Sequence, residues 1–381
     1  MIKKMKSFIR SQMSTFVFLA FILIAFIGML AKPNAFNMYF ISKIPVYDAG
    51  FYTKIASNGY TEFRQTAFYP LWPFLLSPIK YLGNSDFVLF ASIFALFLFW
   101  LSLIILQKFA KIILTAEYIF PVLIIYALNP NSLFHALPYA ESLSALLSAS
   151  FLYYWYELLQ GEKKQAQFLL SAAALSASRP ILLQSSLSMI FAVLLVSIFS
   201  PHERGRIMFH FSVGIRLILA LVAGYIPYGI MCHLKFNDAF APFHAQVLWD
   251  RKFGIHWSLI LQPKSVSGSD NVLFWDIQAF YLPLIMMITA FWMPIRRNIV
   301  FWYCALFSAA HGAIAFLTYP IFMSLGRHIF ALPFFALALG LWIESIPDRF
   351  NPKRIIWIYA GINACFLIYW WTRYARNGWI G

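Results

Sequence analysis

The chain has 381 residues, of which 61% are hydrophobic and only 11% are charged. In soluble domains about a quarter of the residues are charged, so this composition excludes an ordinary soluble domain and indicates an integral membrane protein. The formal net charge is +15, but the lysines and arginines stand in short clusters between apolar segments, which is typical of a membrane protein rather than of a nucleic-acid-binding one.

Apolar segments recur along the whole chain and predict an all-α, polytopic membrane protein with about eleven transmembrane helices. The first segment resembles the core of a signal peptide, but its length and poor cleavage site favour a retained span. We expect one integral membrane domain over 1–381, because no repeat and no soluble insertion is evident. The predicted segments are 14–31, 86–107, 112–128, 139–159, 165–178, 181–199, 207–233, 276–294, 299–318, 328–346 and 354–371.

The loops between these segments fall into two kinds. With the N-terminus in the cytoplasm, the connections on that side are QKFAK, GEKKQ, PHERGR, PIRRN and PDRFNPKR, each with at least two basic residues, as expected of cytoplasmic loops. The other side receives a first loop at 32–73 and a second large loop at 234–275, rich in polar, aromatic and proline residues. We therefore expect the active site on the non-cytoplasmic face, and the lack of an Asn-x-Ser/Thr sequon favours a bacterial plasma membrane.

The first loop contains YDAGFYTKIASNGY, in which Asp48 begins a predicted short helix and Asn58-Gly59 ends it. Phe51, Tyr52, Ile55 and Ala56 fall on one face, so this helix is amphipathic and suited to the membrane interface. Asp48 is either a helix N-cap or a general base at the membrane surface. The following segment 68–82 holds three prolines and predicts an interfacial or broken helix.

Further polar side chains stand near the ends of predicted spans or in the second loop. They are Glu62, Arg64, Tyr139, Glu141, Arg179, Asp238, His244, Gln246, Arg251, Arg327 and His328. An acid inside a span is costly unless it is paired, so Glu141 suggests a functional role, although a carboxylate at a helix N-terminus is also favoured by the helix dipole. Arg179 and Arg327 either bind phosphate or reach to the lipid headgroups.

Several of these motifs resemble one protein family. YDAGFYTKIASNGY followed by AFYPLWPFLLSP is similar to the first luminal loop of the PIG-V-type mannosyltransferases, the second-mannose enzymes of glycosylphosphatidylinositol assembly, and of their bacterial relatives. The resemblance continues, in the family's order, in LPYAESLSALLSASFLYYW, ALSASRPILL, NDAFAPFHAQVLWDR and GRHIFALPFFALALG. The chain departs from the family at Tyr47, where tryptophan is usual, and at Pro180, where a small polar residue is usual.

The resemblance implies a GT-C-like helical bundle, a polyprenyl-phosphate sugar as donor, and a catalytic aspartate in the first non-cytoplasmic loop, which by position is Asp48. Inverting transfer needs one carboxylate to take the acceptor proton. The phosphate leaving group needs positive charge instead of a second acid, in contrast to glycosidases. We expect Arg179, Arg327 and His328 to bind the donor phosphate. The expected substrate contacts are Glu62, Arg64, Tyr139, Glu141, Asp238, His244, Gln246 and Arg251.

The sequence contains no Asp-x-Asp, HExxH or phosphate-loop motif, so we expect neither a catalytic metal nor another cofactor. The expected partners are a polyprenyl-phosphate sugar, a lipid or glycan acceptor and membrane lipids, without nucleic acid or an obligate protein partner. Three alternatives remain at this point: the same fold using another lipid-linked sugar, an inactive scaffold, and a multi-span secondary transporter, which would place polar residues and discontinuous helices near mid-membrane.

Overall fold

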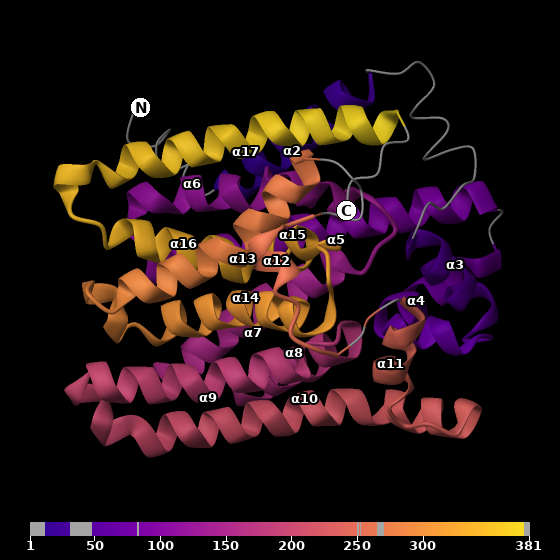
Figure 1. Cartoon of the computed structure of the whole chain (residues 1–381), viewed down its shortest axis with the longest axis horizontal. Helices are drawn as coiled ribbons and strands as arrows, with labels where there is room; N and C mark the ends of the chain where they lie inside the picture. The colour runs from indigo at the N-terminus through magenta and orange to yellow at the C-terminus, as the bar shows by residue number, and fades with distance from the viewer. Residues whose placement is uncertain are drawn as a thin grey trace.

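The computed structural model describes residues 12–30, 48–81, 84–249, 251, 253–264 and 270–376. In these ranges the chain is almost entirely helical and has no strand, so the all-α prediction is confirmed. The longer helices run roughly side by side and form one bundle (Figure 1). They are α2 (Met13–Met29), α5 (Asn84–Ile113), α7 (Glu141–Leu159), α8 (Gln165–Ser178), α9 (Leu182–Phe199), α10 (Ile207–Phe236), α13 (Asp270–Ala290), α14 (Ile299–Thr318) and α17 (Pro352–Ala375).

Shorter helical pieces connect the long helices or cover their ends. They are α3 (Asp48–Asn58), η2 (Phe63–Ala67), α4 (Leu71–Leu76), η3 (Ser77–Tyr81), α6 (Ala116–Ala127), η4 (Pro130–Ala136), η5 (Pro201–Arg206), α11 (Ala241–His244), η6 (Ala245–Trp249), α12 (Ser258–Leu261), η7 (Pro294–Arg297), α15 (Leu325–Phe330), α16 (Pro333–Glu344) and η8 (Asp348–Phe350).

Six of the described helices are long and apolar enough to cross a membrane: α5, α9, α10, α13, α14 and α17. A seventh span is possible by the same measure if α6 and η4, which meet at a bend of 69°, are counted together, and α2 and α16 are shorter apolar helices. The chain is therefore a multi-pass membrane protein, while the count of eleven spans stays a prediction.

Two predicted features differ in the structure: the predicted connection QKFAK lies within the continuous helix α5, and one predicted span is interrupted. The segment 328–346 is divided between α15 and α16, and Leu332 between them has an extended backbone (φ −110°, ψ 150°). The cause is Pro333, because a proline disfavours the helical conformation of the residue before it. This break leaves α15 as a separate six-residue helix.

The first loop has the predicted form where it is described. Helix α3 runs from Asp48 to Asn58 and ends at Gly59, whose φ of +70° suits glycine. Its buried side includes Tyr52 and Ile55. The proline-rich segment forms the short pieces α4 and η3 and not one continuous helix, so the prediction of a broken helix is confirmed. Residues 32–47 of the predicted loop lie outside the described residues.

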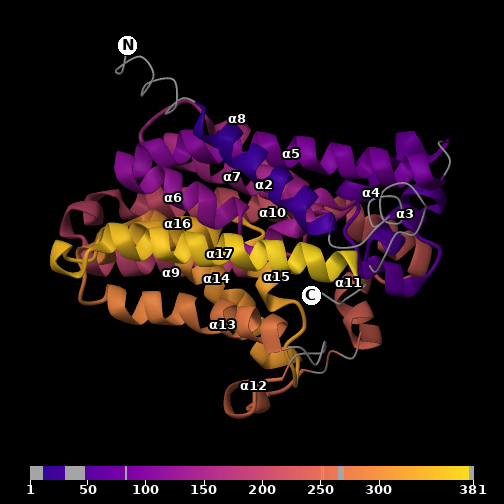
Figure 2. The same cartoon turned by 90° about the horizontal axis from the view of Figure 1, so that it is seen from above.

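The second predicted loop, 234–275, is shorter than expected because α10 continues to Phe236 and α13 begins at Asp270. The part between them carries α11, η6 and α12. Figures 1 and 2 place α11 near α3 and α4 at one end of the bundle. At the opposite end, the Thr115 N–H donates to Glu344, and Lys353 forms an ion pair with Glu117, which ties α6 to α16 and α17.

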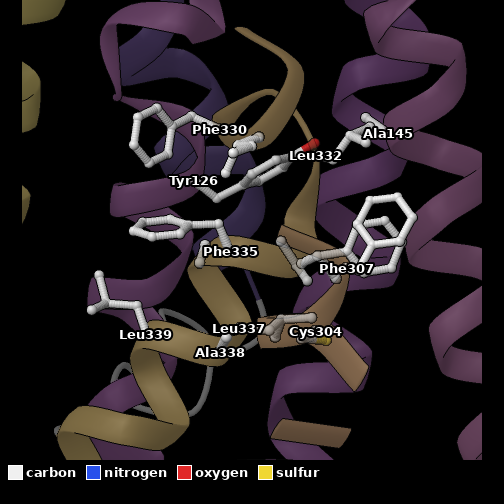
Figure 3. Close-up of a cluster of buried hydrophobic side chains, with 14 of the residues drawn as sticks. Tyr126, Ala145, Cys304, Phe307, Phe330, Leu332, Phe335, Leu337, Ala338 and Leu339 are labelled. Atoms are coloured by element: carbon white, nitrogen blue, oxygen red, sulfur yellow. The ribbon is translucent and has the colours of Figure 1, made fainter. Parts of the chain in front are cut away.

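The core between α6, α14, α15 and α16 is aromatic (Figure 3). Phe330 of α15 packs edge-on against Phe335 with ring centroids 4.7 Å apart, and against Trp275 at 5.9 Å. Phe307 packs against Phe334 at 4.1 Å. Burying rings of this size contributes strongly to packing, so α15 is anchored in the core by the residues that follow Arg327 and His328.

Candidate active site

Five of the side chains singled out in the sequence meet in one cluster: Asp48, Glu141, Arg179, Arg327 and His328. Arg327 Nη1 donates to Asp48 Oδ2 at 2.6 Å, and Arg327 Nε donates to Glu141 Oε1 at 2.5 Å. Arg179 Nη2 lies 3.7 Å from the same Glu141 oxygen. It also donates to His328 Nδ1 at 2.6 Å. We refer to these five residues as the charged cluster.

Each member of the charged cluster stands at or near a helix end, and this explains how distant segments converge. Asp48 and Glu141 are the first residues of α3 and α7, where the helix dipole favours a negative charge. Arg179 follows the end of α8 with an extended backbone. Arg327 and His328 lie on the short helix α15, from which Arg327 contacts the two carboxylates and His328 contacts Arg179.

Glu141, Arg179 and Arg327 of the charged cluster are buried, whereas Asp48 and His328 are partly exposed. Glu141 is 1% exposed and Arg327 7% exposed, whereas the Asp48 side chain is 30% exposed. The Arg327 guanidinium also lies over the rings of Phe134 and Tyr139, at 4.7 and 4.6 Å from their centroids, a cation–π arrangement that is stronger without water. Asp48 is therefore the more exposed of the two carboxylates, and Glu141 is the buried one.

Two buried atoms of the charged cluster lack a hydrogen-bond partner in the described part of the protein: Glu141 Oε2 and Arg179 Nη1. Buried polar atoms are normally satisfied, and exceptions need an explanation. These atoms are available to a ligand or to water. An unused guanidinium nitrogen suits an anionic oxygen, and an unused carboxylate oxygen suits a hydroxyl group.

The tautomer of His328 follows from its contact with Arg179. Arginine has only donors, so His328 Nδ1 must accept and the ring proton must be on Nε2. The His311 ring lies nearly parallel to it, with centroids 6.4 Å apart. His328 thus presents an N–H donor on the edge of its ring away from Arg179.

Arg251 adds a third guanidinium beside the charged cluster. Its Nε donates to the Tyr319 hydroxyl and its guanidinium lies over the Tyr319 ring, 4.5 Å from the centroid. Burial lowers the pKa of Arg251 to about 10, while Asp48 raises it, so Arg251 is charged at neutral pH. Among these described side chains, the guanidinium groups of Arg179, Arg251 and Arg327 outnumber the carboxylates of Asp48 and Glu141 by one positive charge.

The first loop is held in place by hydrogen bonds to the bundle. Trp72 Nε1 donates to the Pro138 carbonyl at 3.1 Å, just before α7. The Tyr228 hydroxyl on α10 donates to the Thr66 carbonyl at 2.6 Å, and the Tyr60 hydroxyl donates to the Phe68 carbonyl at 2.6 Å. These contacts fix the frame on which α3 presents Asp48.

The remaining predicted residues of the first loop are not part of the charged cluster. Glu62 is exposed. Arg64 is also exposed, and its guanidinium lies 4.9 Å from the Phe51 ring centroid and 5.1 Å from that of Trp249. Phe51 is one helical turn from Asp48, so this stack lies beside the charged cluster.

The second-loop residues also lie outside the charged cluster. Asp238 Oδ2 pairs with His244 Nδ1 at 2.7 Å, and this hydrogen bond lowers the pKa of the Asp238 carboxyl. Gln246 Nε2 donates to the Pro242 carbonyl at 3.0 Å. Within the described ranges, no three His, Cys, Asp or Glu side chains are grouped so that they could hold a metal ion.

Sequence reasoning missed three aromatic neighbours of the site. Phe134 lies under Arg327, Tyr319 binds Arg251, and Tyr52 is buried close enough to interact with Asp48 and Glu141. Tyr52 could have been identified from the sequence, because it lies four residues after Asp48 and residues four apart share one face of a helix. The sequence could not have identified Phe134 and Tyr319 as neighbours of the site, because their contacts join segments that are far apart in the chain.

Comparison with known protein families places this chain beside the mannosyltransferases. A family model described as Mannosyltransferase (PIG-V) matches residues 18–240, more than half of the chain. The matched part contains Asp48, Glu141 and Arg179. A search of curated proteins finds no significant match.

Proposed function

The chain belongs to the mannosyltransferase (PIG-V) family and is a membrane-bound glycosyltransferase, and from this premise we propose its donor, mechanism and sidedness. It transfers mannose from a polyprenyl-phosphate sugar to a lipid-linked or glycan acceptor, with inversion at the anomeric carbon and without a metal ion. The reaction takes place on the non-cytoplasmic face of a bacterial plasma membrane, with the N-terminus in the cytoplasm.

Asp48 is the general base in this proposal. It is the only carboxylate of the charged cluster with a substantially exposed side chain, and Arg327 Nη1 fixes one of its oxygens at 2.6 Å. The other oxygen takes the proton of the acceptor hydroxyl as that hydroxyl attacks the anomeric carbon. Positioned bases of this kind contribute about 10²- to 10⁴-fold to a rate.

The three guanidinium groups supply the positive charge that the departing phosphate needs. A polyprenyl-phosphate sugar is a phosphodiester with one negative charge, which equals the excess of one positive charge on Arg179, Arg251 and Arg327 over the two carboxylates. When Asp48 takes the proton, the excess becomes two, which equals the charge of the phosphate dianion that leaves. Arg179 Nη1 and the N–H of His328 are the free donors available to its oxygens.

The acceptor approaches from the side of Asp48 opposite the phosphate, because inversion requires in-line attack. Arg64, stacked on Phe51 and Trp249, offers an exposed cation and aromatic faces for a glycan there. Glu62, Tyr139, Asp238, His244 and Gln246 are further proposed contacts with sugar hydroxyls. Glu141 Oε2 is free to accept from a hydroxyl of the donor sugar.

The observation that carries the proposal is the contact of one buried arginine with both Asp48 and Glu141 in a chain of this family. The test uses the purified full chain in proteoliposomes with radiolabelled polyprenyl-phosphate mannose, a lipid extract of its host and a chelator. Wild type should label a new product, and Asp48→Asn should lose at least about 100-fold of that rate.

Asp348→Asn is the matched control, because it makes the same chemical change at an exposed carboxylate of η8. Equal transfer by wild type and Asp48→Asn would remove Asp48 from the mechanism. If transfer occurred only from a polyprenyl-phosphate glucose or arabinose, that sugar and not mannose would be the one transferred. Loss of transfer in the presence of chelator would overturn the metal-independent step.

A further inference from the structure

Asp276 is an acidic residue within the membrane-spanning helix α13, and the proposed reaction does not use it. It is 2% exposed, and within the described residues no lysine, arginine or histidine forms an ion pair with it. A carboxyl group inside a membrane span is costly and indicates a function by default. Its contacts show what that function is.

Asp276 Oδ1 accepts a hydrogen bond of 2.7 Å from the backbone N–H of Gly326. Gly326 is the second residue of α15, and the residue after it is Arg327. The first N–H groups of a helix have no partner within the helix and need an acceptor from elsewhere. Ser324, at the N-cap of α15, makes no capping hydrogen bond with its side chain, so the acceptor comes from α13.

Gly326 is enclosed on its other side as well. A Cβ atom at this position would lie 3.1 Å from the side-chain amide of Asn131 on η4 and 3.4 Å from Asp276 Oδ1. Asn131 is itself buried. The start of α15 therefore fits closely between two polar side chains from different elements, and a larger residue than glycine would require the Asn131 side chain to move.

We propose that Asp276 is a positioning residue that fixes α15, through the Gly326 N–H, so that Arg327 reaches Asp48 and Glu141. Phe330 anchors the other end of the same helix in the aromatic core (Figure 3). With both ends held, the Arg327 side chain has one direction, and His328 is brought to Arg179. The effect on phosphate binding rests on the proposed function, whereas the fixing of α15 does not.

The test compares Asp276→Asn, Asp276→Ala and the control Asp270→Ala in the full chain in nanodiscs. Asparagine keeps an oxygen that can accept from Gly326, and alanine does not. Asp270 is the exposed first residue of the same helix. Hydrogen exchange of a peptide covering 324–330 should be about 10- to 100-fold faster in Asp276→Ala and within about threefold of wild type in the other two variants.

Affinity for polyprenyl phosphate, measured without any acceptor, gives the functional readout. Asp276→Ala should bind about 10-fold or more weakly, and Asp276→Asn should bind nearly as well as wild type. Unchanged hydrogen exchange in Asp276→Ala would overturn the proposal, and faster exchange with unchanged affinity would overturn its functional half. If wild type itself does not bind polyprenyl phosphate, the proposed function fails while the exchange result still decides the role of Asp276.

A second variant keeps the test valid if Asp276→Ala does not fold. Gly326→Ala leaves the carboxyl group in place but adds a Cβ atom in tight contact, at 3.1 Å, with the Asn131 side-chain amide. It should speed exchange of 324–330 and weaken binding, and adding Asn131→Ala should restore part of both because it removes the obstructing amide. Wild-type behaviour of Gly326→Ala would contradict the enclosed position of α15.

Discussion

Glu141 forms ion pairs with two buried arginines, Arg179 and Arg327, through a single carboxylate oxygen. Removing one partner of a buried ion pair leaves uncompensated charge, which costs about 3–5 kcal/mol. We therefore expect Glu141→Ala to lower the free energy of unfolding by at least about 3 kcal/mol, measured by thermal or denaturant unfolding in detergent. Glu117→Ala is the control, because it removes the exposed partner of Lys353 and should not shift the midpoint. A similar small effect of both changes would show that Glu141 is not the counter-charge.

His328 is expected to act as a neutral donor, because Arg179 occupies its Nδ1. Glutamine places an amide N–H near the position of Nε2, whereas asparagine can only replace the acceptor at Nδ1. His328→Gln should keep most of the affinity for the donor, and His328→Asn should raise the KM for the donor by about 10-fold, the value of one hydrogen bond to a charged group. Equal losses in steady-state kinetics would mean that the ring edge facing away from Arg179 is not used.

At the residue scale, the sequence identified the side chains of the charged cluster but not their pairing. Asp48 and Arg327 were expected to act in one site, and they form a hydrogen bond across 279 positions of the chain. Periodicity and spacing inform only about neighbours within one element, so Arg327 could not be assigned to both carboxylates. Asp276 was the first residue of the predicted span 276–294, whereas the helix begins earlier and places it within the span Val272–Ala290. The cost of a buried charge was the signal that could have singled it out.

Helix packing at the scale of elements depends on glycines where two helices meet. A Cβ atom on Gly224 of α10 would lie 2.0 Å from the Ala173 carbonyl oxygen of α8, so Gly224→Val should separate the two helices and cost at least about 2 kcal/mol of unfolding free energy. Gly361→Ala on α17 meets no atom within 4 Å and should be neutral or stabilising by up to about 1 kcal/mol. Thermal unfolding of both variants tests this, and an unaffected Gly224→Val would contradict the close contact of α8 and α10.

The position of the first loop depends on the packing of one tryptophan, Trp72. Trp72 is fully buried, stacks on Phe94 with ring centroids 5.8 Å apart, and donates to the Pro138 carbonyl next to α7. Trp72→Phe keeps the stacked ring and should lose only about 1 kcal/mol, whereas Trp72→Ala should lose about 3–5 kcal/mol. The rate of limited proteolysis in the loop at 59–62 measures the local effect, and it should be higher in Trp72→Ala than in Trp72→Phe. Equal protease resistance in both variants would show that α4 is held by other contacts.

Elements with local signals were predicted well, and elements fixed by tertiary contacts were not. Asp48 and Asn58-Gly59 gave the bounds of α3, because an acidic residue in the first turn and a glycine with positive φ act within a few residues. The break before Pro333 was missed although the proline was visible, since the apolar run alone suggested a continuous span. That break is important for the site, because it makes α15, the helix with Arg327, separate from α16.

For the whole molecule, the arrangement of charge predicts its orientation in the membrane. The basic connections include the turn after α7, where Lys163 is exposed, and the first loop with exposed Glu62 belongs to the end that holds α3 and α4. Since basic loops stay in the cytoplasm, Glu62→Cys should react with a membrane-impermeant maleimide in intact cells, and Lys163→Cys only after the membrane is opened. Changing the exposed Cys365 to serine removes the background, because Cys232 and Cys304 are buried. If only Lys163→Cys were labelled in intact cells, the orientation would be the reverse and the charged cluster would lie on the cytoplasmic side. The lipid-linked sugar would then have to come from the cytoplasmic leaflet of the membrane.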